Sequence, residues 1–173
     1  SAGCIKIQYG IESLNDSTLQ KLNRENGVDA MKEVVNLTAS LGLLVRGYTM
    51  IGYPWESQES SIKTMLNQLK DFAIDDLRIS FFTPFPGTPL YEKFKRECLL
   101  LTEDYSKYTT DEPVVKTTDL TPENLVELRR DMFRKFYTSK EYEQRRKIKI
   151  VKFPYLKQAY DEFNEFLIQK GIL

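Results

Sequence analysis

Histidine is absent from the 173 residues of this chain. Its absence excludes catalytic triads that use histidine, metal sites with histidine ligands and acid–base catalysis by imidazole. Only two cysteines are present, Cys4 and Cys98, whereas zinc and iron–sulfur sites need three or four ligands. The chain by itself therefore predicts no metal centre, and any proton transfer would fall to carboxylates, lysine, tyrosine or a cofactor.

Net charge and long hydrophobic runs are also lacking. The basic and acidic side chains number 25 each, so composition indicates no general attraction to nucleic acid or to anionic membranes. No apolar run approaches the roughly 18 residues of a membrane span, and no signal peptide is recognisable. Two widely spaced cysteines are typical of a reducing compartment, so we expect a cytoplasmic protein. Cys4 is expected in the core, and Cys98 as a buried or half-buried thiol.

Three segments have the composition of buried β-strands, and each is followed by a helical pattern. The strands are expected at residues 5–9, 45–51 and 77–82. Helices are expected over about 18–24, 28–41, 57–72 and 89–98. We expect Gly10 to end the first strand. The third strand is expected to show almost no alternation, as in a strand covered on both faces.

Alternating strands and helices predict an α/β fold with parallel strands, in which ligands bind at the carboxyl ends of the strands. Three strands are too few for a closed eight-stranded barrel. We therefore expect a partial (β/α) TIM-like barrel with outer helices over residues 1–100, and a helical C-terminal extension over residues 101–173. Within that extension, Thr121 and Pro122 are strong signals for the start of a helix.

Each strand is followed by a short motif. These are Gly-Ile-Glu-Ser at 10–13, Gly-Tyr-Pro-Trp-Glu-Ser at 52–57 and Pro-Phe-Pro-Gly-Thr-Pro at 84–89. In this order they resemble the C-terminal half of the catalytic domain of the radical S-adenosylmethionine (SAM) superfamily. The subgroup they are most similar to has a cobalamin-binding domain and includes the anaerobic magnesium-protoporphyrin monomethyl ester oxidative cyclases. The resemblance covers about residues 3–95, although Trp55 stands where the subgroup usually has glycine.

The resemblance implies that the chain is a fragment of a radical SAM iron–sulfur enzyme. Such enzymes are oxidoreductases, oxidative cyclases or methyltransferases, with cobalamin as an optional second cofactor. Their [4Fe–4S] cluster is held by a C-x-x-x-C-x-x-C motif that this chain lacks, so the fragment alone is expected to be inactive. The alternatives are a non-catalytic binding or interaction domain on the same half-barrel, and a small unrelated α/β module.

The resemblance also implies partners for the chain. They are the missing N-terminal half of the parent enzyme and a small-molecule substrate that the sequence does not disclose. Without that half, the strand at 5–9 would lack a neighbour, so we expect a homodimer or strand exchange. The basic run at 145–152 could contact RNA, but a solvated charged face is favoured and nucleic acid is not an expected partner.

The resemblance further implies which residues bind SAM, and it implies no catalytic residue. Glu12 and Ser13 occupy the place that contacts the ribose, where a carboxylate suits a diol. Arg24 matches an arginine that binds the SAM carboxylate in some members. Residues expected near the adenine are Gly47, Tyr48, Thr49, Gly52, Phe82, Pro84 and Phe85.

Each of these roles has a structural alternative. Ser13 could cap a helix, Arg24 could be a solvated residue at a helix end, and Gly47 could allow a helix to pack closely on its strand. Tyr48 and Thr49 point in opposite directions, and the sequence does not say which one faces the barrel interior. Glu56 and Trp55 are expected to act at the start of a helix and in packing, respectively, and not in ligand binding.

Overall fold

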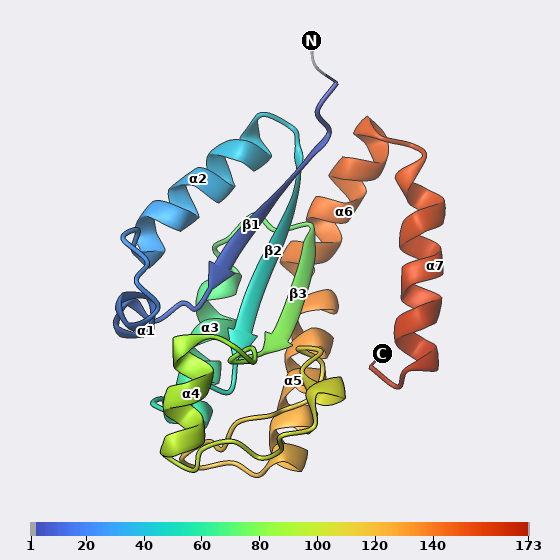
Figure 1. Ribbon diagram of the computed structural model, residues 1–173. Helices are drawn as coiled ribbons and strands as arrows, with labels where there is room; N and C mark the ends of the chain where they lie inside the picture. The colour runs from blue at the N-terminus through green and yellow to red at the C-terminus, as the bar shows by residue number, and fades with distance from the viewer. Residues whose placement is uncertain (1–2, 173) are drawn as a thin grey trace.

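The computed structural model describes residues 3–172, with the backbone alone over residues 58–63. Three parallel strands form one sheet in the order β1 (Lys6–Glu12), β2 (Leu44–Ile51) and β3 (Asp76–Phe81), as Figure 1 shows. A helix follows each strand, so the three carboxyl ends lie at the same end of the sheet. The α/β fold with a partial barrel followed by C-terminal helices is confirmed.

Apart from the strands, the described chain contains seven α-helices and one short 3-10 helix. They are α1 (Asp16–Lys21), α2 (Val28–Ser40), α3 (Gln58–Leu69), α4 (Pro89–Arg96), η1 (Tyr105–Lys107), α5 (Pro122–Tyr137), α6 (Lys140–Lys152) and α7 (Leu156–Gln169). Figure 1 shows α2 and α3 behind the sheet, whereas none of the helices in the described part of the chain lies over the face toward the viewer. Helices α6 and α7 lie beyond β3, on the side of the sheet away from α2.

Two helices begin as their sequences predict. The hydroxyls of Thr88 and Thr121 accept hydrogen bonds from backbone amides in the first turns of α4 and α5, and a proline follows each threonine. Threonine satisfies an amide that has no partner within the helix, and proline has no amide to satisfy. These local signals fix where both helices start.

The main hydrophobic cluster joins the covered face of the sheet to helices from both parts of the chain. Val45 and Ile79 contribute from the strands, while Leu125, Met132 and Leu167 contribute from α5 and α7. All five side chains are almost fully buried. The core is therefore shared by residues on both sides of position 100.

The strands alternate between a covered and an uncovered face. In β3, Leu77, Ile79 and Phe81 are buried, whereas Arg78 is exposed and Ser80 is half-buried. Our expectation that this strand shows almost no alternation was wrong. Helices pack against only one face, so side chains of successive residues meet different surroundings.

Two further local expectations were wrong. Strand β1 does not end at Gly10 but continues to Glu12, because an irregularity between the two residues takes up the extra Ile11. Both cysteines are exposed: Cys4 precedes β1, and Cys98 lies just after α4 with a φ of 54°. Neither thiol belongs to the core, since each cysteine lies in a connecting segment outside the strands and helices.

Candidate functional site

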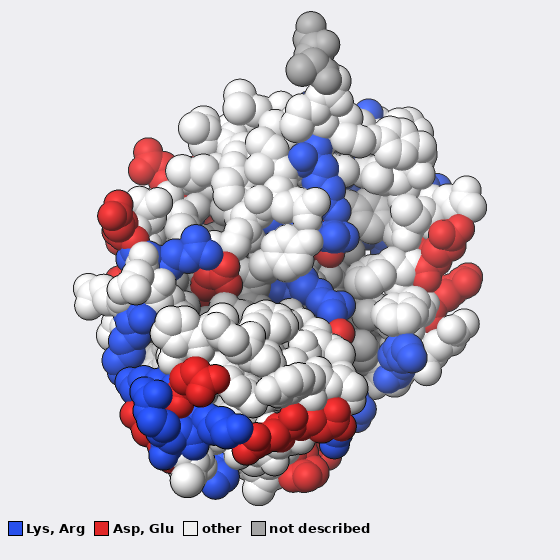
Figure 2. All heavy atoms as spheres, viewed as in Figure 1, with Lys and Arg blue, Asp and Glu red and all other residues white. Residues whose placement is uncertain are grey.

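Polar side chains cross the uncovered face of the sheet from strand to strand. Asp76 on β3 accepts hydrogen bonds from Arg46 on β2 and from Lys6 on β1, the latter over 2.9 Å. The hydroxyl of Tyr48 donates to the side-chain carbonyl of Gln8 over 2.5 Å. Figure 2 shows basic side chains in a line over the strands with little acidic surface beside them. In a closed barrel this face would line the interior.

The carboxyl end of β1 carries an ion pair between two residues that the sequence predicts as SAM ligands. The Nη2 of Arg24 lies 2.6 Å from the Oε1 of Glu12, 12 residues earlier in the chain. Glu12 has a φ of 63°, a conformation that costs free energy for any residue except glycine. A side chain at Gly10 would place its Cβ 2.6 Å from the same carboxylate oxygen. A glycine at position 10 therefore leaves room for the pair.

A hollow of about 570 Å³ adjoins this ion pair. Gln8, Gly10 and Arg24 are among its lining residues, together with residues of α2. It follows β1, which is an edge strand, and it is open to solvent. A ligand in this hollow could therefore reach the guanidinium of Arg24 without any movement of the backbone.

Ser13 is placed differently from its neighbour Glu12. Its side chain is almost fully buried, its hydroxyl accepts a hydrogen bond from the amide of Asn15 over 3.1 Å, and its own amide donates to the carbonyl of Ile11 over 2.8 Å. These bonds build the turn that leads into α1. They favour the structural alternative for Ser13, and its contact with ribose stays a prediction.

The structure separates Tyr48 from Thr49. Tyr48 lies on the uncovered face and is 36% exposed, whereas Thr49 is 1% exposed and lies on the face covered by helices. Only Tyr48 could meet a ligand inside the barrel through its side chain.

The glycine within β2 is required by packing, and the glycine just after β2 by backbone conformation. A Cβ at Gly47 would lie 2.9 Å from the terminal carbons of both Ile11 and Ile74, so Gly47 allows close packing on the covered face. Gly52 has a φ of 87°, in the left-handed region that favours glycine. The structure thus favours the packing alternative for Gly47, and contacts of either glycine with adenine stay predictions.

The loop after β3 contributes one exposed ring. Phe82 and Pro84 are buried, and the ring of Phe82 packs 4.8 Å from that of Tyr53 and 5.4 Å from that of Trp55. Phe85 is 49% exposed. Among the three residues of this loop that were predicted near the adenine, Phe85 is therefore the one whose side chain is accessible.

The turn after β2 is held by side chains from α1. The indole of Trp55 donates to the hydroxyl of Thr18 over 3.1 Å, and that hydroxyl donates to the carboxylate of Glu56. Glu56 is 8% exposed. The hydrogen bond to Thr18 shows that Trp55 packs and bonds within the fold, as predicted from the sequence.

The phenol of Tyr53 lies in the same region. Burial raises the pKa of Tyr53, and the nearby carboxylates of Glu12 and Glu56 raise it further.

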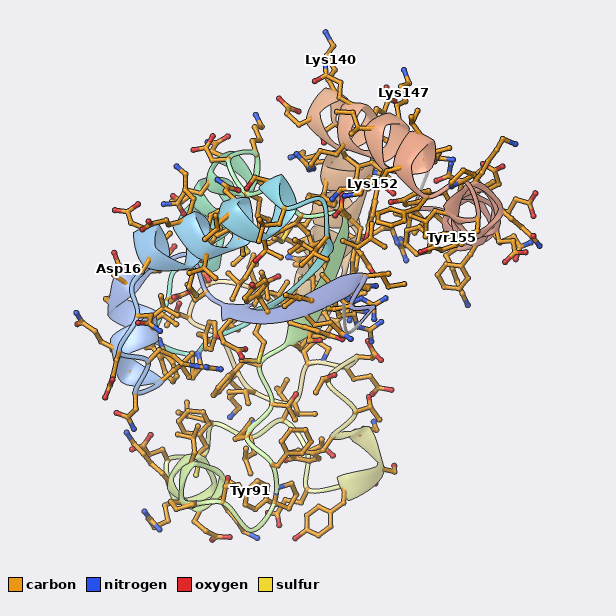
Figure 3. The ribbon with its side chains drawn as sticks, turned by 90° about the horizontal axis from the view of Figure 1, so that it is seen from above. Asp16, Tyr91, Lys140, Lys147, Lys152 and Tyr155 are labelled. Atoms are coloured by element: carbon orange, nitrogen blue, oxygen red, sulfur yellow. The ribbon has the colours of Figure 1, made fainter. Side chains whose placement is uncertain are left out.

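The sequence interpretation missed the polar residues of the uncovered face. Gln8, Arg46, Asp76 and Arg78 were not among the candidate residues, although they alternate with apolar neighbours in their strands. This period of two is the signal that could have found them. The basic run at 145–152 lies on α6, where Lys147 projects away from the sheet (Figure 3).

The residues present do not fit an iron–sulfur cluster. The two cysteines lie before β1 and after α4, and the described residues contain no group of three or more histidine, cysteine or acidic side chains that could hold a metal. Glu12 and Arg24 do fit SAM, since a carboxylate accepts from ribose hydroxyls and a guanidinium pairs with a carboxylate. Within residues 3–172, no helix is long and apolar enough to cross a bilayer.

Comparison with known proteins gives several relatives, although no protein-family model matches. The chain is 32% identical over 135 residues to an uncharacterized methyltransferase of Pyrococcus horikoshii, covering 78% of this chain and 29% of that protein. It is 28% identical over 139 residues to the anaerobic magnesium-protoporphyrin IX monomethyl ester cyclase of Cereibacter sphaeroides, covering 80% of this chain and 22% of that protein. The chain thus spans less than a third of the length of these curated relatives.

Among solved structures, the archaeal Elp3 of Methanocaldococcus infernus with an N-terminal deletion has a TM-score of 0.49 and 28% sequence identity. The match covers 55% of this chain and 23% of that one. The sequence relatives span most of the present chain and are named as enzymes, a methyltransferase and a cyclase. Together with the three motifs in their expected order, the similarity to these sequence relatives shows that the chain belongs to the radical SAM superfamily.

Proposed function

We propose that this chain supplies the SAM-binding half of a radical SAM enzyme of the methyltransferase or oxidative cyclase type. The observation that carries the proposal is the ion pair between Glu12 and Arg24 at the carboxyl end of β1. That is the end of a parallel sheet where α/β proteins bind ligands. Tyr48 is exposed on the uncovered face of the neighbouring strand.

The two side chains have complementary roles in this proposal. The guanidinium of Arg24 exchanges the carboxylate of Glu12 for the carboxylate of SAM, and Glu12 then accepts hydrogen bonds from the ribose hydroxyls. Bound SAM would supply the methyl group or the 5′-deoxyadenosyl group for the reaction. The exchange keeps Arg24 in one ion pair, while the carboxylate of Glu12 exchanges a cationic partner for neutral hydroxyl donors.

The iron–sulfur cluster would come from outside this chain. Two cysteines, one before β1 and one after α4, do not hold a [4Fe–4S] cluster, so we propose that cysteines in another part of a longer protein hold it. The chain alone would then bind SAM without cleaving it. Cobalamin would be a second cofactor of the longer protein, and a small molecule its substrate.

The partner that completes the site would cover the outer edge of β1. Among the described residues, β1 pairs only with β2. Val34 and Leu37 on α2, and Leu41 at its C-cap, are each about half exposed or more and share one helical stripe. A further strand and helix would cover both surfaces, as expected for the preceding part of the barrel.

Equilibrium dialysis with S-adenosylhomocysteine tests SAM binding without requiring the cluster. Glu12→Gln and Arg24→Gln should each weaken binding by about tenfold, the loss of one charge-assisted hydrogen bond. Glu103→Gln is the matched control, because it removes a carboxylate that pairs with Lys95 elsewhere on the surface. Unchanged affinity in both site variants would show that Glu12 and Arg24 do not bind SAM. A wild-type chain that binds no nucleoside would favour a non-catalytic interaction domain.

A further inference from the structure

A groove with a volume of about 790 Å³ runs along β3, on the side away from β1. One wall is formed by the uncovered face and outer edge of the sheet, through Arg46, Tyr48 and Arg78. The other wall is formed by α5 and α7, through Arg129, Phe133 and Phe166. This volume lies in the range of about 300–1,000 Å³ that is typical of small-molecule sites.

Positive charge predominates in the groove. Five basic and two acidic side chains line it, an excess of three positive charges. Each carboxylate is already shared between two cations: Asp111 pairs with Arg78 and Arg129, and Asp76 pairs with Arg46 and Lys6. A carboxylate shared in this way neutralises only one of its two partners. The groove therefore favours an anion.

Aromatic rings provide the second feature of the groove. Phe163 and Phe166 stack with their centroids 6.3 Å apart and an interplanar angle of 20°, and Phe133 stacks on Tyr137 in the same manner over 6.2 Å. Phe166 is 47% exposed, and the Nζ of Lys170, another lining residue, lies 5.7 Å from the centroid of its ring. Exposed ring faces attract flat apolar groups.

We propose that this groove binds a small organic anion, a molecule with a flat aromatic body and a carboxylate or sulfonate group. The rings of α5 and α7 would stack on the body, while Arg78 and Arg46 would hold the anionic group. The groove includes Tyr48, which is also a candidate SAM residue, but it runs along β3, whereas the ion pair of Glu12 with Arg24 lies at the carboxyl end of β1, on the other side of β2. The proposal rests on the charges and rings that line the groove and not on SAM binding.

The test uses two fluorescent dyes that differ mainly in charge. 8-Anilino-1-naphthalenesulfonate carries a flat aromatic body and a sulfonate, whereas N-phenyl-1-naphthylamine is its uncharged counterpart. In fluorescence titrations of the folded chain, Arg78→Gln should weaken binding of the sulfonate dye by about three- to tenfold and leave the uncharged dye unchanged. Phe166→Ala should weaken binding of both dyes, because both stack on the ring.

Matched controls lie outside the groove. Arg96→Gln removes an exposed arginine from α4, and Tyr155→Ala removes an exposed ring before α7. Urea unfolding of each variant establishes that it is folded at the titration temperature. Equal binding of the sulfonate dye to wild type and Arg78→Gln, or equal weakening by the controls, would overturn the proposal. Competition by S-adenosylhomocysteine would show that the dye occupies the SAM site instead.

Discussion

The hydroxyl of Tyr137 stands where a fourth strand would pair with β3. It accepts a hydrogen bond from the amide of Leu77 and donates one to the carbonyl of the same residue, both over 2.9 Å. Further along the strand, the amide of Phe81 donates to the carbonyl of Thr110 over 2.8 Å. The chain thus closes the outer edge of β3 with its own later segments, whereas β1 pairs with β2 alone among the described residues.

Tyr137→Phe should lower the free energy of unfolding by about 1–3 kcal/mol. The substitution keeps the ring but leaves the buried amide and carbonyl of Leu77 without their partner. Urea denaturation followed by circular dichroism measures the change. Tyr155→Phe is the control, since that side chain is 60% exposed, and its unfolding should match wild type. Equal stability of Tyr137→Phe and wild type would mean that water hydrogen-bonds to the amide and carbonyl of Leu77 in the variant.

Gly47→Ala should destabilise the protein by about 1–3 kcal/mol through overpacking. The added Cβ would lie 2.9 Å from side-chain carbons of both Ile11 and Ile74, which are themselves fully buried. Thermal unfolding measures the loss, and dialysis with S-adenosylhomocysteine measures binding in the same samples. We expect unchanged affinity at temperatures where the variant is folded. Weaker binding at full stability would support contact with adenine instead of packing.

The buried carboxyl of Asp75 should make stability depend on pH. Its Oδ2 accepts a hydrogen bond from the amide of Val45 over 2.9 Å and lies 3.5 Å from the Nζ of Lys149, while its Oδ1 has no hydrogen-bond partner among the described residues. Burial raises the pKa of Asp75 above the ordinary value of 3.8, although Val45 and Lys149 oppose the rise. The folded state thus binds this proton more tightly than the unfolded state does.

The raised pKa determines whether the free energy of unfolding rises or falls with pH. The contribution of Asp75 to the free energy of unfolding is fully present below pH 3.8 and is lost as pH rises through the raised pKa of the folded state. Asp75→Asn removes the titration, so wild type should lose stability relative to this variant as pH increases. Urea denaturation at several pH values measures the difference. Asp71→Asn, an exposed control, should follow the wild-type profile; identical profiles for all three proteins would contradict the prediction.

The chain should self-associate through β1 and α2. An edge strand offers unpaired backbone groups, and the exposed stripe of Val34, Leu37 and Leu41 offers apolar area on the neighbouring helix. We expect a dimer whose population rises with concentration in sedimentation or light-scattering measurements. Leu37→Lys should shift it toward monomer, while Ile168→Lys on α7 should not. A wild-type chain that stays monomeric at high concentration would oppose this prediction.

Local sequence predicted the three strands and most helices of the fold, but it did not predict helix α6 over Lys140–Lys152. Thr88 and Thr121 mark helix starts because the signal involves only neighbouring residues, and the three strands lie within two or three residues of their expected limits. The exposure of Cys4 and Cys98 was not predicted, since a small apolar residue is buried only if another element packs over it. The pairing of Glu12 with Arg24 was not predicted either, although both residues were candidates.

The sequence by itself determined the strand–helix order, the three motifs after the strands and, through them, membership of the radical SAM superfamily. Tertiary structure alone decided that Tyr48 lies on the uncovered face and Thr49 on the face covered by helices, and that Tyr137 hydrogen-bonds to the edge of β3, 60 residues away from it in sequence. The physical reason is that alternation gives a strand two faces without saying which one is covered. That choice depends on where distant helices pack, because burial is a property of the assembled chain.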